Sequence, residues 1–128
     1  AGQIIVQFKT EGTVLVTAPG LAYDNVYITL DNSLYAIDRF SGKEHLHFQR
    51  TQGFLVSPTV VGNIGYCSTT DVLTNGKVSI PGMLYAVDAH TGVQLWSYPL
   101  PGSIGDGVAF AGDTLLVKSD DGYLYAIH

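Results

Sequence analysis

The chain has 128 residues, a length that allows one ordinary domain with its own hydrophobic core. Hydrophobic residues make up 46% of it and charged residues only 13%, a balance that excludes an intrinsically disordered chain. The formal net charge of −5 disfavours nucleic acid and anionic membrane surfaces as partners, because both are themselves negative. No apolar run approaches the roughly 20 residues of a membrane span, so no membrane insertion is expected.

Short β-strands separated by turns recur along the chain, and no segment has a helical pattern. Taken in chain order, the expected strands cover 14–18, 26–30, 34–37, 54–57, 64–69, 84–87, 94–96, 107–110, 114–119 and 124–127. They are rich in Val, Ile, Tyr and Thr, which favour strands. Proline and glycine mark breaks next to several of them, at Pro19-Gly20, Pro58 and Pro101-Gly102. The sequence therefore predicts an all-β fold.

One motif occurs three times: an apolar strand, a turn containing Asp and Gly, and a second strand. Its fullest copy is Leu84–Trp96, Leu34–Lys43 repeats it, and Leu124–Ile127 is a third copy at the end of the sequence. The copies begin 50 and then 40 residues apart. Four short strands in a repeat of about 40 residues indicate the blades of a β-propeller.

The middle repeat is longer because it carries an insertion at residues 71–82. Asn75-Gly76 lies at the centre of the insertion, and Pro81-Gly82 closes it. Asn-Gly is a strong signal for a tight hairpin turn. We therefore expect a protruding β-ribbon at this place.

The repeats divide residues 1–128, a single propeller segment, into blade pieces. These are a closing strand at 1–12, a repeat at 13–52, a repeat with the insertion at 53–102, and a repeat at 103–128 that lacks its last strand. Residues 1–8 align with 41–48 and with 91–98, which are fourth strands of blades. Three blades are too few for a ring, since propellers typically have four to eight.

Two arrangements would complete the propeller. The chain is either part of a longer propeller, or copies join head to tail as a homodimer. In the second case each N-terminal strand completes the last blade of its neighbour, and two chains make six blades. The matching ends favour this self-association.

The repeated Leu-Tyr-Ala-Ile/Val-Asp, followed by Thr/Ser-Gly and then Leu-Trp, resembles the PQQ-like β-propeller repeat over essentially the whole chain. Leu84–Trp96 matches best, and Ser57-Pro58 fits the first strand of the family. The position of Trp96 is Leu46 in one copy and Val6 in another, so the regular tryptophan docking of quinoprotein dehydrogenases is interrupted.

The resemblance implies one of two functions. Some members are quinone-dependent alcohol or sugar dehydrogenases, which hold the cofactor and a calcium ion on the central axis. Many others, similar to the propeller lipoprotein of outer-membrane assembly, lack the cofactor and act as binding scaffolds. Both groups are mostly exported, so the resemblance implies a periplasmic or extracellular location.

The residues of the repeated motif are interpreted as structural. Asp38 and Asp88 recur because the turn recurs, and an Asp that accepts backbone N–H bonds explains both. The tyrosines are expected to pack between blades. The structural set is Tyr35, Asp38, Gly42, Tyr85, Asp88, Gly92, Trp96 and Tyr125.

Other residues that could carry chemistry are isolated. His45 and His47 would face the same side of a strand and could share a metal, but Glu44 would point to the opposite face and no third ligand is evident. Asp120-Asp121-Gly122 reads as an ordinary hairpin turn rather than a calcium loop. Cys67, the single cysteine, reads as a buried thiol. We therefore expect no catalytic residue, no cofactor and no metal ligand.

The function expected is a non-catalytic scaffold that binds protein or peptide. Loops on a repeat scaffold often carry its specificity, so the candidate binding residues lie in the insertion and in the loop between blades: Thr74, Asn75, Gly76, Lys77, Arg50, Thr51 and Gln52. In the alternative, the ribbon only caps a sheet edge. Two other functions remain open, a fragment of a quinone-dependent oxidoreductase and a purely structural ring-forming unit.

Overall fold

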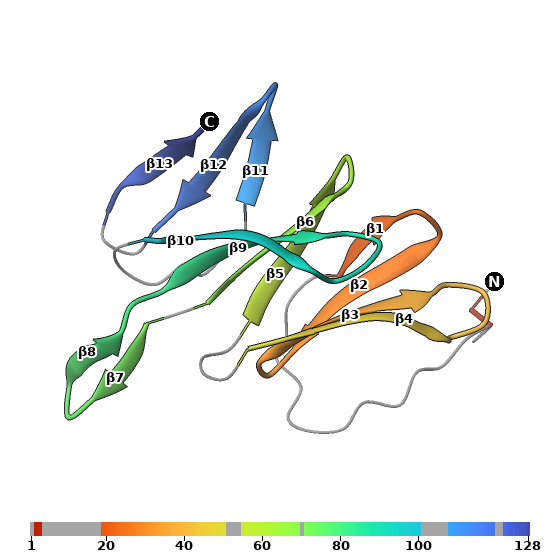
Figure 1. Ribbon diagram of the computed structural model, residues 1–128, viewed down its shortest axis with the longest axis horizontal. Coiled ribbons are helices and arrows are strands. Elements are labelled where there is room, and N and C mark those ends of the chain that lie inside the picture. Colours follow the sequence, from red (N-terminus) through yellow and green to blue (C-terminus); the bar gives the residue numbers. More distant parts are fainter. Residues whose placement is uncertain (1, 4–18, 51–54, 70, 101–107, 120–121) are drawn as a thin grey trace.

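The computed structural model describes residues 2–3, 19–50, 55–69, 71–100, 108–119 and 122–128. In this part of the chain it contains thirteen β-strands and no helix (Figure 1). No described segment is a helix long and apolar enough to cross a membrane. The predicted all-β fold is confirmed.

The first sheet is an antiparallel meander in the order β1-β2-β3-β4. Its strands are β1 (Gly20–Ala22), β2 (Asn25–Leu30), β3 (Ser33–Asp38) and β4 (Glu44–Gln49). Leu30 and Ser33 are register partners, so only Asp31 and Asn32 connect β2 to β3. Asp31 has a φ of 49°, a left-handed conformation that Asp tolerates better than most residues.

The second sheet repeats this meander in the order β5-β6-β9-β10. Its strands are β5 (Leu55–Val61), β6 (Ile64–Thr69), β9 (Met83–Asp88) and β10 (Gln94–Pro99). The pairing of Tyr66 with Ala86 matches that of Tyr27 with Ala36 in the first sheet. The two sheets therefore have the same register, as the sequence repeat predicts.

The insertion forms a separate two-stranded ribbon of β7 (Val72–Thr74) and β8 (Lys77–Ile80). Asn75 and Gly76 connect the strands with φ values of 52° and 75°, and two positive values in succession are what a type I′ turn requires. Figure 1 shows the ribbon standing out from the second sheet. The predicted protruding hairpin is confirmed.

The third sheet has three strands in the described residues, β11 (Val108–Ala111), β12 (Thr114–Lys118) and β13 (Leu124–Ile127). Its order is again a meander, and Leu116 pairs with Ala126 where the other sheets pair Tyr with Ala. Antiparallel sheets of this kind are the blades of a propeller, so the predicted architecture is confirmed.

The hydrophobic core lies between the sheets, because each strand presents alternate side chains to its two faces. One cluster joins the first and second sheets through Tyr27, Leu34, Ala36, Leu46, Phe48, Leu55, Cys67, Tyr85, Val87 and Ala89. A second cluster joins the second and third sheets through Tyr66, Leu84, Ala86, Leu100, Leu115 and Val117. Successive residues of β9 thus enter different clusters, and the second sheet is covered on both faces.

The expected strand break at Pro58 is wrong, because β5 continues through it from Leu55 to Val61. Proline cannot donate to a strand ladder, but β5 is an edge strand and its register shifts between Val56 and Thr59. The irregularity accommodates the proline without ending the strand. Gly20 was also expected at a break, but it begins β1. The expected strand at 14–18 lies outside the described residues.

Candidate functional site

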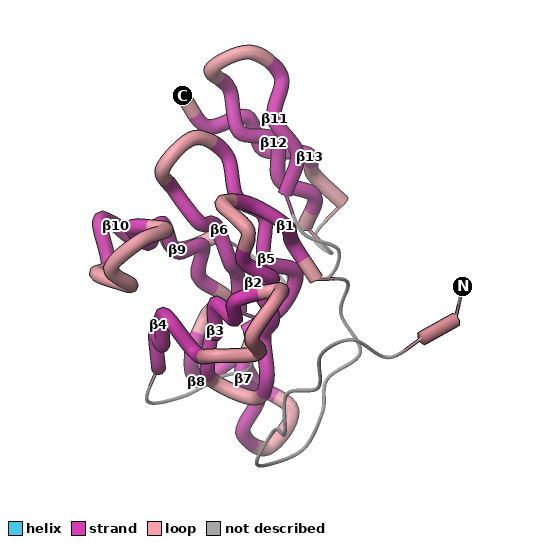
Figure 2. Tube along the Cα trace, turned by 90° about the vertical axis from the view of Figure 1, so that its right-hand side faces the viewer, coloured by secondary structure: helices cyan, strands magenta, loops and turns pink. Residues whose placement is uncertain are grey.

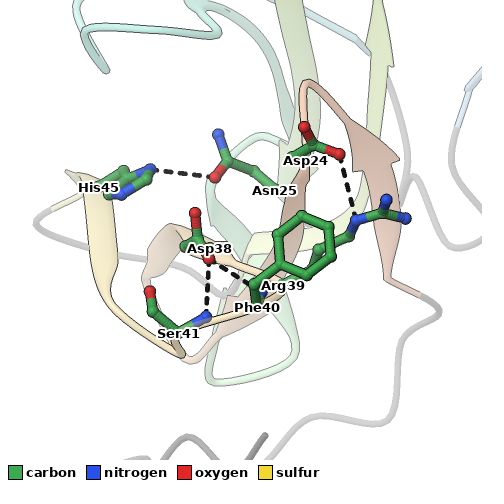
Figure 3. A network of polar contacts seen from close by, with 7 residues as sticks. All are labelled: Asp24, Asn25, Asp38, Arg39, Phe40, Ser41 and His45. Atoms are coloured by element: carbon green, nitrogen blue, oxygen red, sulfur yellow. Dashed lines mark hydrogen bonds and ion pairs between the residues drawn. The ribbon is translucent and has the colours of Figure 1, made fainter. Parts of the chain in front are cut away.

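The repeated Asp holds the turn between the third and fourth strands of its sheet. Asp38 Oδ1 accepts the backbone N–H groups of Phe40 and Ser41, both at 2.8 Å (Figure 3). Asp88 Oδ1 does the same for His90 at 2.8 Å and Thr91 at 2.9 Å. These are the contacts of a carboxylate that closes a turn.

The same bonds set the acidity of both aspartates. Backbone N–H bonds, from Ser41 first and then Phe40, lower the pKa of Asp38. Those from Thr91 and then His90 lower the pKa of Asp88. A carboxyl with a lowered pKa stays ionised at neutral pH and is a poor proton donor.

A set of exposed polar contacts links the turns at one end of the sheets. Arg39 Nε lies 3.1 Å from Asp24 Oδ1 within the first sheet (Figure 3). The Tyr23 hydroxyl donates to the carbonyl of Gly62 and, at 3.1 Å, to Asn63 Oδ1 in the second sheet. In the third sheet, His128 Nε2 lies 2.7 Å from Asp113 Oδ2. These side chains bind one another and tie neighbouring turns together.

The two histidines of β4 have separate partners. His45 Nδ1 lies 3.1 Å from Asn25 Oδ1 (Figure 3), and His47 Nε2 lies 3.1 Å from Ser33 Oγ. The His47 ring also stacks on Tyr35, with 4.5 Å between centroids. Within the described part of the chain, no three His, Cys, Asp or Glu residues are grouped to hold a metal ion.

The expected placement of Glu44 on the opposite face from His47 is wrong. Glu44 Oε1 lies 3.8 Å from His47 Nδ1. The cause is a β-bulge, because Ala36 pairs with Leu46 but the next residue of β3, Ile37, pairs with Glu44. The extra residue, His45, shifts the alternation by one position.

Cys67 is buried in the cluster between the first and second sheets, as expected. Desolvation raises the pKa of its thiol to about 12. The group therefore stays protonated at physiological pH, and a protonated thiol is a poor nucleophile.

The loop between the first two blades begins with Arg50, which is half-buried rather than freely exposed. Its guanidinium lies 4.7 Å from the ring centroid of Tyr85, across the two sheets. Its backbone N–H donates to the carbonyl of Asn32 at 2.8 Å. Arg50 is thus part of the contact between sheets, and Thr51 and Gln52 lie outside the described residues. A binding role for this loop stays a prediction.

The four candidate residues of the insertion, Thr74, Asn75, Gly76 and Lys77, form the exposed tip of the ribbon. Sequence reasoning missed two apolar neighbours, Leu73 and Val78, which are 62% and 53% exposed. They are register partners, so both side chains lie on the same face of the ribbon. The signal available in the sequence was an apolar residue on each side of the Asn-Gly turn.

The base of the ribbon is held by side chains that bond to backbone. Asp71 Oδ1 accepts the N–H of Gly82 at 2.6 Å, and Thr69 Oγ1 accepts that of Met83 at 2.9 Å. Between the two ribbon strands, the Thr74 and Ser79 hydroxyls lie 3.0 Å apart. The ribbon is therefore anchored where it leaves the second sheet, while its tip is exposed.

A groove of about 520 Å³ runs between the second and third sheets. Its aromatic wall consists of Tyr66, Trp96 and Phe110. The ring centroid of Tyr66 lies 5.9 Å from that of Trp96 and 5.2 Å from that of Phe110. Tyr98 and Ile127 also line it, and Asp113 and His128 lie at its polar side.

The quinone and calcium that some PQQ-like proteins hold do not fit the described residues. Trp96, the single tryptophan of the chain, is tilted against Tyr66 within the contact between sheets. The described residues also lack a convergent group of acidic ligands that could hold the calcium.

The stacked antiparallel sheets define the class of protein as a β-propeller assembly. A family model described as outer membrane protein assembly factor BamB matches residues 2–98 and, in a second match, residues 80–128. The chain therefore belongs to this family of PQQ-like repeats, and the resemblance seen in the sequence is confirmed.

Two solved structures are similar to the chain. BamB from Moraxella catarrhalis superposes with a TM-score of 0.67 at 18% sequence identity, over 87% of this chain and 32% of that one. The computationally designed Ika4 protein superposes with a TM-score of 0.55 at 14% identity, over 100% of this chain and 99% of that one. No curated protein sequence gave a significant match. The chain thus spans about a third of the length of the BamB structure.

Proposed function

We propose that the chain is a non-catalytic propeller module that binds an extended segment of another protein through its β7–β8 ribbon. The observation that carries the proposal is the exposed pair Leu73 and Val78 on one face of the ribbon. Apolar side chains that stand out on a polar hairpin gain free energy when a partner removes them from water.

The ribbon also offers its partner backbone groups. It has only two described strands, so each has one edge without a strand beside it. An extended peptide binds such an edge by forming main-chain hydrogen bonds, and its alternate side chains then reach the apolar pair. Lys77 at the exposed tip favours an acidic residue in that peptide. The anchored base keeps the ribbon ordered before binding, which lowers the entropic cost of association.

The family description, outer membrane protein assembly factor, supports a scaffold that binds protein rather than a small substrate. A periplasmic or extracellular location belongs to the same proposal. A binding role for the loop at Arg50 is a separate part of this proposal.

The test is a phage-displayed library of random peptides, selected against the immobilised 128-residue chain. The affinity of enriched peptides is then measured by fluorescence polarisation. The ribbon variant Leu73→Asp with Val78→Asp is expected to weaken binding at least about tenfold, which is about 1.4 kcal/mol. The matched control is Val93→Asp, an equally exposed valine in the Asp88 turn, and it is expected to leave the affinity unchanged.

Equal affinity of the enriched peptides for the ribbon variant would overturn this proposal, and so would a selection that enriches no peptide. Circular dichroism checks that both variants keep the strand content of the parent chain.

A further inference from the structure

The tip of the β7–β8 ribbon consists of two residues whose own chemistry peptide binding does not use. Asn75 and Gly76 connect the two strands, and both are exposed. Figure 2 shows the ribbon at the lower end of the described strands. An asparagine loses its side-chain amide most readily when glycine follows it, because glycine has no side chain to shield its backbone nitrogen. The tip is therefore a candidate for covalent modification.

The chain has four asparagines, and hydrogen bonds hold the side chains of three of them. Asn25 Oδ1 lies 3.1 Å from a histidine nitrogen of β4. Asn32 Nδ2 donates to the carbonyl of Arg50 at 2.5 Å, and Asn63 Oδ1 accepts the Tyr23 hydroxyl at 3.1 Å. The residues that follow these three are Val, Ser and Ile. Folding therefore fixes three of the four amides beside shielded backbone nitrogens.

Asn75 has none of these restraints. In the part of the chain that the structure describes, neither its side chain nor the backbone N–H of Gly76 takes part in a hydrogen bond. A Cβ atom at Gly76 would meet no atom within 4 Å, so nothing packs against this peptide group. The peptide group is thus free to turn toward the side-chain amide, and water reaches both.

We propose that Asn75 is a site of spontaneous deamidation that changes the charge and the backbone of the ribbon tip. The nitrogen of Gly76 attacks Cγ of Asn75, and the new C–N bond closes a succinimide ring. The bond from Cγ to Nδ2 breaks, and the side-chain nitrogen leaves as ammonia with the proton of the Gly76 N–H. Water then opens the ring. The net change replaces an amide by a carboxylate and needs neither an oxidant nor a reductant.

The two carbonyls at which water opens the ring lead to different ribbons. Hydrolysis at Cγ gives aspartate, and Asp-Gly suits a type I′ turn as well as Asn-Gly does. Hydrolysis at the backbone carbonyl gives isoaspartate, in which the main chain runs through the side chain and is longer. The pairing of Thr74 with Lys77 leaves room for only two residues between the strands. The longer connection therefore disturbs the register that aligns Leu73 with Val78.

The modification regulates the ribbon as a binding site, and this consequence rests on the proposed function. Lys77, two residues from Asn75, favours an acidic residue in the bound peptide. A carboxylate at position 75 attracts Lys77 to itself and repels that acidic residue. Because these charges are exposed, aspartate should weaken binding only slightly. Isoaspartate should weaken it more, since it also displaces the apolar pair.

The first test follows the modification itself by mass spectrometry. The folded 128-residue chain is incubated at mildly alkaline pH in water enriched in heavy oxygen, and then digested in ordinary water. Asn75 is expected to take up heavy oxygen at least about tenfold faster than any of the other three asparagines. The variant Asn75→Gly, whose Gly-Gly pair also suits the turn, is expected to show no uptake in the ribbon.

A matched variant separates the sequence of the tip from its structure. Ser33→Gly places a glycine after Asn32, which also lies in a tight turn between two strands. The Asn32 amide is bonded to Arg50, so it is expected to react at least about tenfold more slowly than Asn75 in the same chain. Circular dichroism checks that this variant keeps the strand content of the parent chain.

The second test measures the affinity of the peptides enriched against the chain. Asn75→Asp reproduces one product and is expected to bind peptides with an acidic residue about threefold more weakly at low salt, but not at high salt. The isoaspartate form, separated from the incubated chain by chromatography, is expected to bind them more weakly still. The control Val93→Asp adds the same charge beyond the far end of β9 and is expected to leave the affinity unchanged (Figure 1).

This inference is overturned if Asn75 keeps its amide as long as the other three asparagines do. It is overturned equally if Asn32 in the Ser33→Gly variant reacts as fast as Asn75. Equal affinity of the acidic peptides for the parent chain and for Asn75→Asp overturns the regulation of binding. A selection that enriches no peptide overturns the proposed function instead, while mass spectrometry still decides the modification.

Discussion

At the scale of single residues, the repeated aspartates connect sequence to stability most directly. Asp38 and Asp88 each accept two backbone N–H bonds that hold the turn between the third and fourth strands of a sheet in place. The recurrence of Asp in the sequence therefore reflects a recurring backbone geometry. Both carboxyl groups are ionised in this geometry, and their pKa values lie below the usual value of 3.8.

This lowering makes the stability of the chain depend on pH. A carboxyl whose folded pKa is below its unfolded pKa stabilises the fold above the unfolded value, near 4, and loses this effect as the pH falls through the folded value. We expect the urea concentration at the unfolding midpoint of the parent chain to decrease when the pH is lowered below about 4. The double variant Asp38→Asn with Asp88→Asn is expected to be less stable than the parent chain at pH 7, and its stability should depend less on acid. Urea unfolding followed by circular dichroism measures both effects.

The parent chain and this double variant should therefore become closer in stability as the solution is acidified. A difference between their urea midpoints that stays constant from pH 7 to pH 3 would show that the turns do not depend on ionised aspartate.

At the scale of elements, the ribbon is an addition to a complete blade. Ser68 pairs with Leu84 and the second sheet has the same register as the first, although residues 70–82 separate its middle strands. In the first sheet, Asp31 and Asn32 alone make this connection. The ribbon strands pair with each other and form a separate sheet.

Replacing residues 70–82 by Asp-Asn, the connection of the first sheet, is therefore expected to leave the fold intact. The melting temperature should change by no more than a few degrees, equivalent to about 1 kcal/mol or less. Peptides that depend on Leu73 and Val78 should no longer bind. Thermal melting and fluorescence polarisation measure the two effects. A chain that fails to fold would show that the ribbon covers an edge that the second sheet needs.

At the scale of the whole molecule, the stack of sheets is directional. Each sheet has two different apolar faces, and the chain buries one of each kind in every contact that it makes. The contact between the first and second sheets is therefore repeated between the second and third.

The structure of the whole molecule also bears on the alternative function, a fragment of a quinone-dependent oxidoreductase. In the described part of the chain, no three His, Cys, Asp or Glu residues are grouped to hold a metal ion, and the Trp96 ring is tilted against Tyr66. We expect that the purified chain, incubated with pyrroloquinoline quinone and calcium and then desalted, retains no visible absorption. It should also fail to oxidise alcohols in a dye-coupled assay. Retained absorption together with dye reduction would establish the oxidoreductase function instead.

Much of the fold could be predicted from the sequence, because the repeats and turn signals are local. The Asn75-Gly76 turn specified the ribbon, and the shared motif specified the register of β3 and β9. Bulges were not predictable in this way. The irregularity at Pro58 and the one that brings Glu44 near His47 depend on how each strand fits its partner. A single extra residue reverses the alternation, and no local pattern marks it.

The candidate site was only partly visible in the sequence. The insertion was recognised, but its exposed pair Leu73 and Val78 was not, because burial is a property of the surrounding elements. Arg50 appeared to be a loop residue, yet its guanidinium lies over Tyr85 from the next sheet. Contacts of this kind join residues far apart in the chain, and a repeat does not specify them.

The sequence by itself determined the blade architecture, the turns and the phase of the repeat, since these follow from periodic side chains and local hydrogen bonds. Only the tertiary structure decided which equivalent residues are covered. Leu34, Leu84 and Leu124 stand at the same position of the same motif, and among the described strands only the first two have a sheet packed on them. The physical reason is that burial depends on the neighbouring sheet, which the motif does not encode.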